Sequence, residues 1–146
     1  MMPMIADRKT KLIDCIGHID FPRITDPRGS LTFIEGSRHV PFDIARVYYL
    51  YDVPADAERA GHAHYKLQQV IIATSGSFNV NVDNGLEKTT IRLDRPYRGL
   101  LLNPMVWRTI DGFSAGAMCL VIASIVYDEA DYIREYDEFL RLVRER

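Results

Sequence analysis

The sequence predicts a single all-β domain, and two observations support this. Short alternating or continuous apolar runs follow one another along most of the chain, and turn-forming residues separate them. Only after residue 127 do apolar residues recur at the spacing of a helix. Regularly spaced short strands are typical of a β sandwich or barrel. The runs that we assign to strands are residues 30–35, 44–51, 67–74, 77–82, 86–93, 99–102 and 117–125.

The run at residues 77–82 predicts one strand of a β-hairpin. Phe78, Val80 and Val82 alternate with polar residues, so they share one face of the strand. Residues 83–85, Asp-Asn-Gly, tolerate the positive φ that a tight turn requires. We therefore expect this run to pair with the run at 86–93.

Two other runs, at residues 70–73 and 120–123, are apolar at every position. Strands of this kind are covered on both faces. We expect them to be central strands of a sheet or strands at a dimer interface.

The C-terminal segment, residues 128–145, is expected to form a helix that packs on the β domain. Asp128 is available to cap its beginning, and Arg141 and Arg144 lie near its end, where cations are favoured. The apolar residues at helical spacing are Tyr132, Ile133, Tyr136, Phe139, Leu140 and Val143.

Length and composition narrow the class of protein. The chain of 146 residues is expected to form one domain over 1–146, with residues 1–10 as a flexible N-terminus. A formal charge of −2 gives no general attraction to nucleic acid. No apolar run approaches the roughly 18 residues that span a membrane. Cys15 and Cys119 are a poor disulfide framework, and we expect a cytoplasmic protein.

The motif Gly-His-Ala-His at residues 61–64 is the strongest candidate for chemistry. Alternate side chains of a strand share a face, so His62 and His64 are expected to project to the same side. Two imidazoles on one face can bind a metal or exchange protons with a substrate. The alternative is a pair without a chemical role, because histidine is often partly buried and satisfied by a hydrogen bond.

Cations and aromatic residues surround this motif in the sequence. Arg28, Arg46, Arg59 and Lys66 can converge on the mouth that the histidines face, or each can be a solvated surface cation. The fork of an arginine suits a pyrophosphate. Tyr48 is the aromatic residue expected in the pocket, because it shares a strand face with Arg46.

Five segments taken together resemble one known family. They are DPRGSLTFIE, PFDIARVYYLYD, RAGHAHYKLQQV, LLNPMVWRTIDGFS and LVIASIVYDEADYIREYDEFL. In this order they are similar to the sugar nucleotide 3,4-ketoisomerases, small cupin proteins that act on dTDP-4-keto-6-deoxy-D-glucose. The resemblance covers nearly the whole chain after about residue 12. It implies a cupin fold, meaning a double-stranded β-helix or jelly-roll antiparallel barrel, here with a short C-terminal helix. It also implies a homodimer in which one strand is exchanged or closely paired.

The resemblance assigns roles to particular residues. His62 and His64 match the paired active-site histidines, and with Tyr48 they are the expected catalytic residues. Arg28 lies in a motif that resembles one with which related epimerases hold a pyrophosphate. The expected substrate-binding residues are Arg28, Arg46, Arg59, Lys66, Gln68, Trp107 and Arg108.

No metal and no cofactor are expected. Metal-binding cupins add a glutamate and a third histidine to the His-x-His pair, but this chain has Gln68 or Gln69 and Arg108 at those places. A guanidinium cannot ligate a metal and repels one.

The implied reaction moves a ketone from C4 to C3 of the sugar. The carbonyl acidifies the C3 proton, a neutral histidine removes it, and the enediol is reprotonated at C4. Histidine suits both steps because its unperturbed pKa is about 6.5. Two alternatives stay open: a 3,5-epimerase, which a histidine–carboxylate pair with a tyrosine acid would favour, and a sugar-binding cupin without catalysis.

Overall fold

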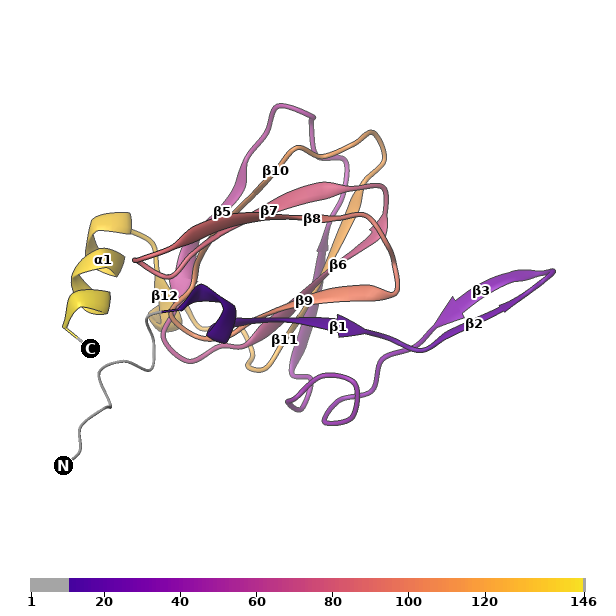
Figure 1. Cartoon of the computed structure of the whole chain (residues 1–146), viewed down its shortest axis with the longest axis horizontal. Helices are drawn as coiled ribbons and strands as arrows, with labels where there is room; N and C mark the ends of the chain where they lie inside the picture. Colours follow the sequence, from indigo (N-terminus) through magenta and orange to yellow (C-terminus); the bar gives the residue numbers. More distant parts are fainter. Residues whose placement is uncertain (1–10, 146) are drawn as a thin grey trace.

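The computed structural model describes residues 11–145, and its body is two five-stranded antiparallel sheets that face each other (Figure 1). The first sheet has the order β1 (Ile16–Asp20), β9 (Arg98–Leu102), β6 (Gln69–Ser75), β11 (Met118–Ala123) and β4 (Arg46–Leu50). The second has the order β12 (Tyr132–Ile133), β5 (Arg59–His64), β10 (Trp107–Asp111), β7 (Phe78–Asp83) and β8 (Lys88–Leu93). The predicted all-β cupin fold is confirmed.

One detail of the prediction is wrong, because the body is a jelly-roll sandwich and not a closed barrel. Within residues 11–145, no strand pairing joins the two sheets. Apolar side chains from the inner faces of both sheets hold them together, including Ile71, Phe78, Val80 and Leu100. Packing between faces needs no ladder of hydrogen bonds between the sheet edges.

The predicted hairpin is confirmed as β7 and β8. Phe78, Val80 and Val82 are buried in the core, and β7 pairs with β8 in register from Phe78 opposite Leu93. The turn is longer than expected, because the Asn84 side chain accepts hydrogen bonds from the backbone N–H groups of residues 86 and 87. Strand β8 therefore begins at 88 and not at 86.

The two wholly apolar runs are central strands, as predicted. β6 lies between β9 and β11, and Val70, Ile71, Ile72 and Ala73 are all buried. Ile71 and Ala73 face the core between the sheets, while Val70 and Ile72 pack under Phe21 and other side chains of the segment before β4.

The C-terminal prediction is wrong in extent. Residues 128–145 form a short 3-10 helix (Glu129–Asp131), strand β12 and the helix α1 (Tyr136–Arg144). Asp128 caps the 3-10 helix and not α1. Residues 132 and 133 join the sheet because they pair with His64 and Ala63 of β5. The burial of Phe139 holds α1 against the sheet.

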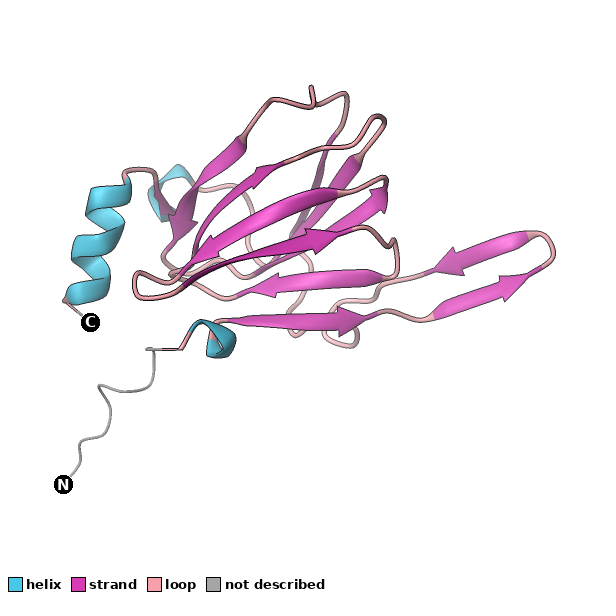
Figure 2. Ribbon diagram, turned by 45° about the horizontal axis from the view of Figure 1, so that its top comes forward, coloured by secondary structure: helices cyan, strands magenta, loops and turns pink. Residues whose placement is uncertain are grey.

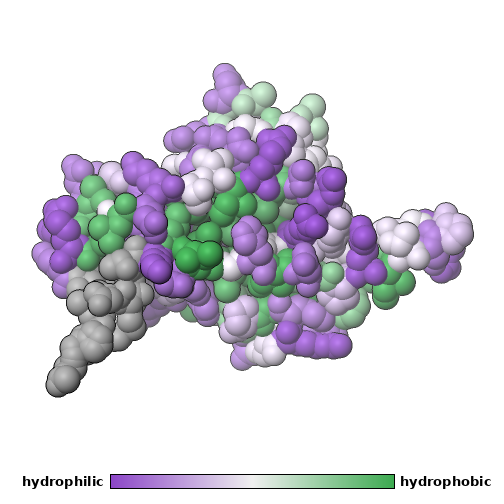
Figure 3. All heavy atoms as spheres, viewed as in Figure 1, coloured by the Kyte–Doolittle hydropathy of each residue, from purple (hydrophilic) through white to green (hydrophobic). Residues whose placement is uncertain are grey.

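A two-stranded hairpin, β2 (Arg23–Asp26) and β3 (Gly29–Thr32), projects from the body as an arm (Figures 1 and 2). Its strands pair only with each other among the described residues. Ile24 and Leu31 are more than half exposed, and apolar residues are visible on the arm in Figure 3.

Three further findings complete the fold. A short 3-10 helix (Leu12–Asp14) precedes β1. Cys15 and Cys119 form no disulfide. Among residues 11–145, no helix is long and apolar enough to cross a membrane. The prediction of a flexible N-terminus at 1–10 lies outside the described residues.

Candidate active site

A pocket of about 630 Å³ opens beside β4, β5 and β12. Four of the predicted residues line it from β4 and β5: Arg46, Tyr48, Arg59 and His62. Arg46 and Tyr48 share a face because β4 alternates, with Val47 and Tyr49 exposed on the other side. The full lining comprises Arg46, Val47, Tyr48, Leu50, Glu58, Arg59, Ala60, His62, Ile110, Val121, Tyr132 and Arg134.

The two histidines lie side by side, but they are not equivalent. Their rings are 4.8 Å apart between centroids and nearly perpendicular. His62 lines the pocket, whereas His64 is only 1% exposed and lies outside the pocket lining. The Tyr132 ring packs on both, with centroids 4.9 Å from His62 and 4.4 Å from His64. His62 is therefore the histidine that a ligand can touch.

A β-bulge sets the direction of His62. Opposite β10, Arg108 pairs with His62 and Thr109 pairs with Ala60, so Gly61 is the additional residue. Ala60 has φ of 73° and Gly61 has φ of 86°, both in the left-handed region. An alanine in this region is strained, and such strain is often kept where a side chain must be aimed.

The ring of His64 contacts a buried carboxylate on which periodicity gave no information. Its Nδ1 lies 3.1 Å from Oδ2 of Asp131, which is 6% exposed. Asp131 also accepts hydrogen bonds from the backbone N–H of Lys66 at 2.8 Å and of Leu67 at 3.2 Å. The short 3-10 helix brings Asp131 into the sheet edge beside β5.

Both histidines are held neutral. Burial and, to a smaller extent, the nearby charge of Arg108 lower the pKa of His62 to about 3 and that of His64 to about 2. Although Asp131 favours a proton on His64, burial and the cation outweigh it. The contact between His64 and Asp131 is then a hydrogen bond from a neutral ring to a carboxylate.

Arg108 carries a positive charge into the interior of the sandwich. It is 0% exposed, its Nε donates to the carbonyl of Val106 at 3.1 Å, and its Nη1 donates to Oε1 of Gln69. Its Nη2 has no hydrogen-bond partner among the described residues. Burial lowers its pKa to about 10, so it stays protonated at neutral pH. Burial likewise raises the pKa of Tyr48.

Further cations and aromatic rings form the mouth of the pocket. The Arg46 guanidinium lies 5.2 Å from the Tyr48 ring, and its Nε and Nη2 are buried without a partner in the described chain. Arg134 lies 4.1 Å above the Tyr132 ring, and Glu129 accepts two hydrogen bonds from it at 2.6 and 2.8 Å. Arg59 also lines the pocket.

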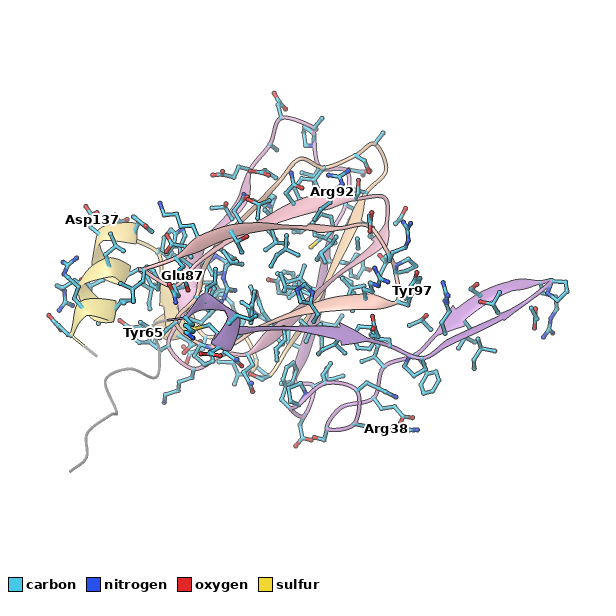
Figure 4. All side chains as sticks on the ribbon, in the orientation of Figure 1. Arg38, Tyr65, Glu87, Arg92, Tyr97 and Asp137 are labelled. Carbon is cyan, nitrogen blue, oxygen red and sulfur yellow. The ribbon has the colours of Figure 1, made fainter. Side chains whose placement is uncertain are left out.

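Five predicted substrate-binding residues do not line this pocket, and one of them is the fully buried Arg108. Arg28 lies at the end of the arm, with its side chain 90% exposed and paired with Asp26. Trp107 faces away from Arg108 along β10 and packs on α1. Lys66 and Gln68 follow the far end of β5, and their neighbour Tyr65 lies on the side of α1 (Figure 4). The Gln68 amide donates to Asn103 instead.

Conversely, the sequence pattern did not assign a site role to Gln69, Asp131, Tyr132 or Arg134. The signal for Asp131 and Arg134 was present, because polar and charged residues interrupt the apolar period between 129 and 135. An interruption of this kind also fits the polar face of a helix, which is the structure predicted for that segment.

Among residues 11–145, no group of three or more histidine, cysteine, aspartate or glutamate side chains is arranged to hold a metal ion. Near the histidines, Gln69 and Arg108 offer an amide and a cation. The expectation of a site without metal stays a prediction.

A jelly-roll sandwich with one neutral histidine at its pocket, and a second histidine and a guanidinium buried beside it, is typical of a cupin whose site can exchange protons with a ligand. The family model described as "FdtA: WxcM-like, C-terminal" matches residues 15–144. The chain belongs to this family.

Proteins similar to this chain carry consistent names. The TDP-4-oxo-6-deoxy-alpha-D-glucose-3,4-oxoisomerase of Aneurinibacillus thermoaerophilus is 44% identical over 86% of this chain and 90% of its own length. The 3,4-ketoisomerase QdtA of Thermoanaerobacterium thermosaccharolyticum, in complex with TDP, is 41% identical. It has a TM-score of 0.90 and the match covers 92% of this chain and 98% of QdtA. The TDP-quinovose 3,4-ketoisomerase WlaRB of Campylobacter jejuni is 44% identical, with a TM-score of 0.83 over 86% and 97% of the two chains.

Proposed function

We propose that this protein is a sugar nucleotide 3,4-ketoisomerase that moves the ketone of dTDP-4-keto-6-deoxy-D-glucose from C4 to C3. The names of its relatives at 41–44% identity support this reaction. The observation that carries it is the neutral His62 in the pocket, with the unpartnered Nη2 of Arg108 buried on the adjacent strand. This combination supplies a base and a positive charge for an enediolate.

The reaction begins at the carbon next to the carbonyl. His62 removes the proton from C3, and the electron pair of the C–H bond moves through C4 to the carbonyl oxygen. The charge on that oxygen is stabilised by the Tyr48 hydroxyl at the pocket wall and by the positive charge of Arg108, which is buried on the strand next to β5, until the oxygen takes a proton and an enediol forms. C4 then receives a proton while the C3 hydroxyl loses its own, leaving the ketone at C3. His62 acts at carbon because it lines the pocket and His64 does not.

The arginines at the mouth are assigned to the nucleotide diphosphate. Arg46, Arg59 and Arg134 line the pocket together, and two nitrogens of Arg46 are buried without a partner among the described residues. Guanidinium groups form paired hydrogen bonds with phosphate oxygens.

A homodimer explains the projecting arm. A lone two-stranded hairpin is marginally stable in water, yet β2 and β3 expose Ile24 and Leu31. We assign these residues to contact with a second copy of the chain. Arg28, at the end of the arm, can then meet a diphosphate only at the site of that second copy. Replacing both apolar residues by aspartate should give monomers in light scattering, and an unchanged dimer would contradict this assignment.

The setting follows from the substrate. A 3-keto sugar nucleotide is the acceptor that an aminotransferase needs, so we place the enzyme in the synthesis of an amino sugar for a surface glycan such as an O-antigen. Cys15 and Cys119, which form no disulfide, are consistent with a reducing cytoplasm.

Two rivals differ in product. His64 and Asp131 form a histidine–carboxylate pair, which is the feature expected to favour a 3,5-epimerase, so that criterion does not separate the two enzymes. A sugar-binding cupin without catalysis would leave the substrate unchanged. The names of the relatives favour the ketoisomerase over both.

Incubation with dTDP-4-keto-6-deoxyglucose in deuterated water tests the proposal. The isomerase gives a 3-keto product, the epimerase keeps the 4-keto group and labels C3 and C5, and the binder changes nothing. His62→Asn should reduce turnover about 10²- to 10⁴-fold, as loss of a general base does, and leave dTDP binding unchanged. His18→Asn, exposed on β1, is the matched control and should turn over normally.

A further inference from the structure

The carboxylate behind the histidines has a geometry that specifies one form of the His64 ring. Asp131 is buried and accepts three hydrogen bonds: from Nδ1 of His64, from the Lys66 backbone and from the Leu67 backbone. A carboxylate can only accept. Nδ1 of a neutral His64 must therefore carry the proton, and Nε2 is left as an acceptor.

That acceptor is enclosed in the protein. Nε2 of His64 is buried without a hydrogen-bond partner among the described residues. The ring that carries it lies against His62 on one side and against Tyr132 on another. A proton that reaches His64 during turnover can bind only at Nε2, because Nδ1 is already occupied.

We infer that Asp131 is a positioning residue that holds His64 in the Nδ1–H form and so keeps its Nε2 ready to accept a proton beside His62. The inference rests on the proposed function for its catalytic part. The form of the ring itself is a property of the resting protein.

Replacement of Asp131 by asparagine should change the tautomer of His64 from Nδ1–H to Nε2–H. The NH₂ group of the new amide must stand at one of the two former oxygen positions. At the Oδ1 position it would oppose the Lys66 N–H, which now donates at 2.8 Å. At the Oδ2 position it opposes only the longer bond from Leu67 at 3.2 Å and can donate to Nδ1 of His64. The second arrangement costs less, and it requires the proton of His64 to move to Nε2.

Nitrogen-15 NMR of protein labelled in its histidines reads this form directly and needs no substrate. In the unmodified protein, His64 should be neutral with the proton on Nδ1, and in Asp131→Asn the proton should be on Nε2. Asp128→Ala is the matched control, because it removes the cap of the same 3-10 helix without touching His64. It should keep the Nδ1–H form. The inference is overturned if His64 of the unmodified protein carries its proton on Nε2 or is doubly protonated. It is also overturned if His64 keeps the Nδ1–H form in Asp131→Asn.

Turnover tests the catalytic part. Asp131→Asn should lower kcat at least about tenfold, as loss of an orienting partner of a histidine does, and leave the Kd for dTDP within about twofold. If Asp131→Asn moves the proton of His64 to Nε2 and kcat does not change, the positioning role is overturned. If the unmodified protein instead makes no 3-keto sugar, the proposed function fails, while the NMR result stands by itself. If Asp131→Asn does not fold, the NMR spectrum of the unmodified protein still decides the form of the ring.

Discussion

Arg108 illustrates how a single residue can serve a site at the expense of stability. Its guanidinium is fully buried, and among the described residues Nη2 has no partner. Burial of a charge costs several kcal/mol, and only hydrogen bonds or an opposite charge offset it. The position therefore suits an enediolate better than it suits the resting protein.

Arg108→Met should raise the free energy of unfolding by about 1–2 kcal/mol, because an apolar side chain of similar length removes the buried charge. The loss of its hydrogen bonds to Gln69 and to the Val106 carbonyl offsets part of the gain. Turnover should fall at least 100-fold, as on loss of an oxyanion donor. Urea unfolding and product formation measure the two effects. Arg144→Met, exposed at the end of α1, should change neither, and a destabilised Arg108→Met would show that the charge is compensated.

The histidines allow a prediction on pH. Burial lowers the pKa of His62 to about 3, so in the free enzyme the ring stays neutral far below its unperturbed value of 6.5. The acid limb of kcat/KM therefore should not occur near pH 6.5, and kcat/KM should stay level from about pH 7.5 down to about pH 5. Initial rates across this range measure it. A midpoint near 6.5 would show that His62 is solvated like a free imidazole.

For single residues, the alternation of side chains along a strand made part of the site predictable. His62, Arg46 and Tyr48 are where the two-residue period places them. Asp131 was not predictable in this way, because it reaches His64 across 67 residues of sequence through a 3-10 turn. Periodicity describes one element, whereas this contact depends on the fold.

At the scale of elements, the bulge in β5 is the feature that aims the active-site residue. Sequence alone indicated a strand with two histidines on one face but not the additional residue Gly61, since a bulge depends on the register with β10. The C-terminal segment shows the same limit. Its apolar spacing is helical, but Tyr132 and Ile133 gain more by pairing with β5, and the helix begins only at Tyr136.

Because of the bulge, two neighbouring substitutions should change the free energy of unfolding in opposite directions. Gly61→Ala should lower the free energy of unfolding by about 1–2 kcal/mol, because Gly61 has φ of 86°, and should reduce turnover by displacing His62. Ala60→Gly should raise stability by up to about 1 kcal/mol, because φ of 73° strains alanine. Denaturant titrations and product formation measure both.

Gly116→Ala provides the matched control. Gly116 also has a positive φ and open space for a Cβ, but it lies in the loop before β11. The Gly116→Ala variant should lose as much stability as Gly61→Ala but should keep normal turnover. Equal turnover in the two variants would show that the bulge does not aim His62.

At the scale of the whole molecule, two neutral histidines in one sandwich link folding to pH. Their pKa values are about 3 and 2 in the folded protein and return to about 6.5 on unfolding. Below pH 6.5 the unfolded chain therefore binds up to two protons that the folded protein does not bind. The stability from these groups is fully present above about pH 6.5 and is lost as the pH falls.

The free energy of unfolding should consequently decrease between about pH 6.5 and about pH 5, with a slope that approaches about 2.7 kcal/mol per pH unit for two protons. Urea titrations at intervals of pH in this window measure the slope before carboxylates begin to titrate. His64→Asn should roughly halve it, and His18→Asn, which replaces an exposed ring on β1, is the matched control. A slope near zero in the unmodified protein would mean that the two rings bind protons equally well in the folded and unfolded chains, which contradicts the lowered pKa values of His62 and His64.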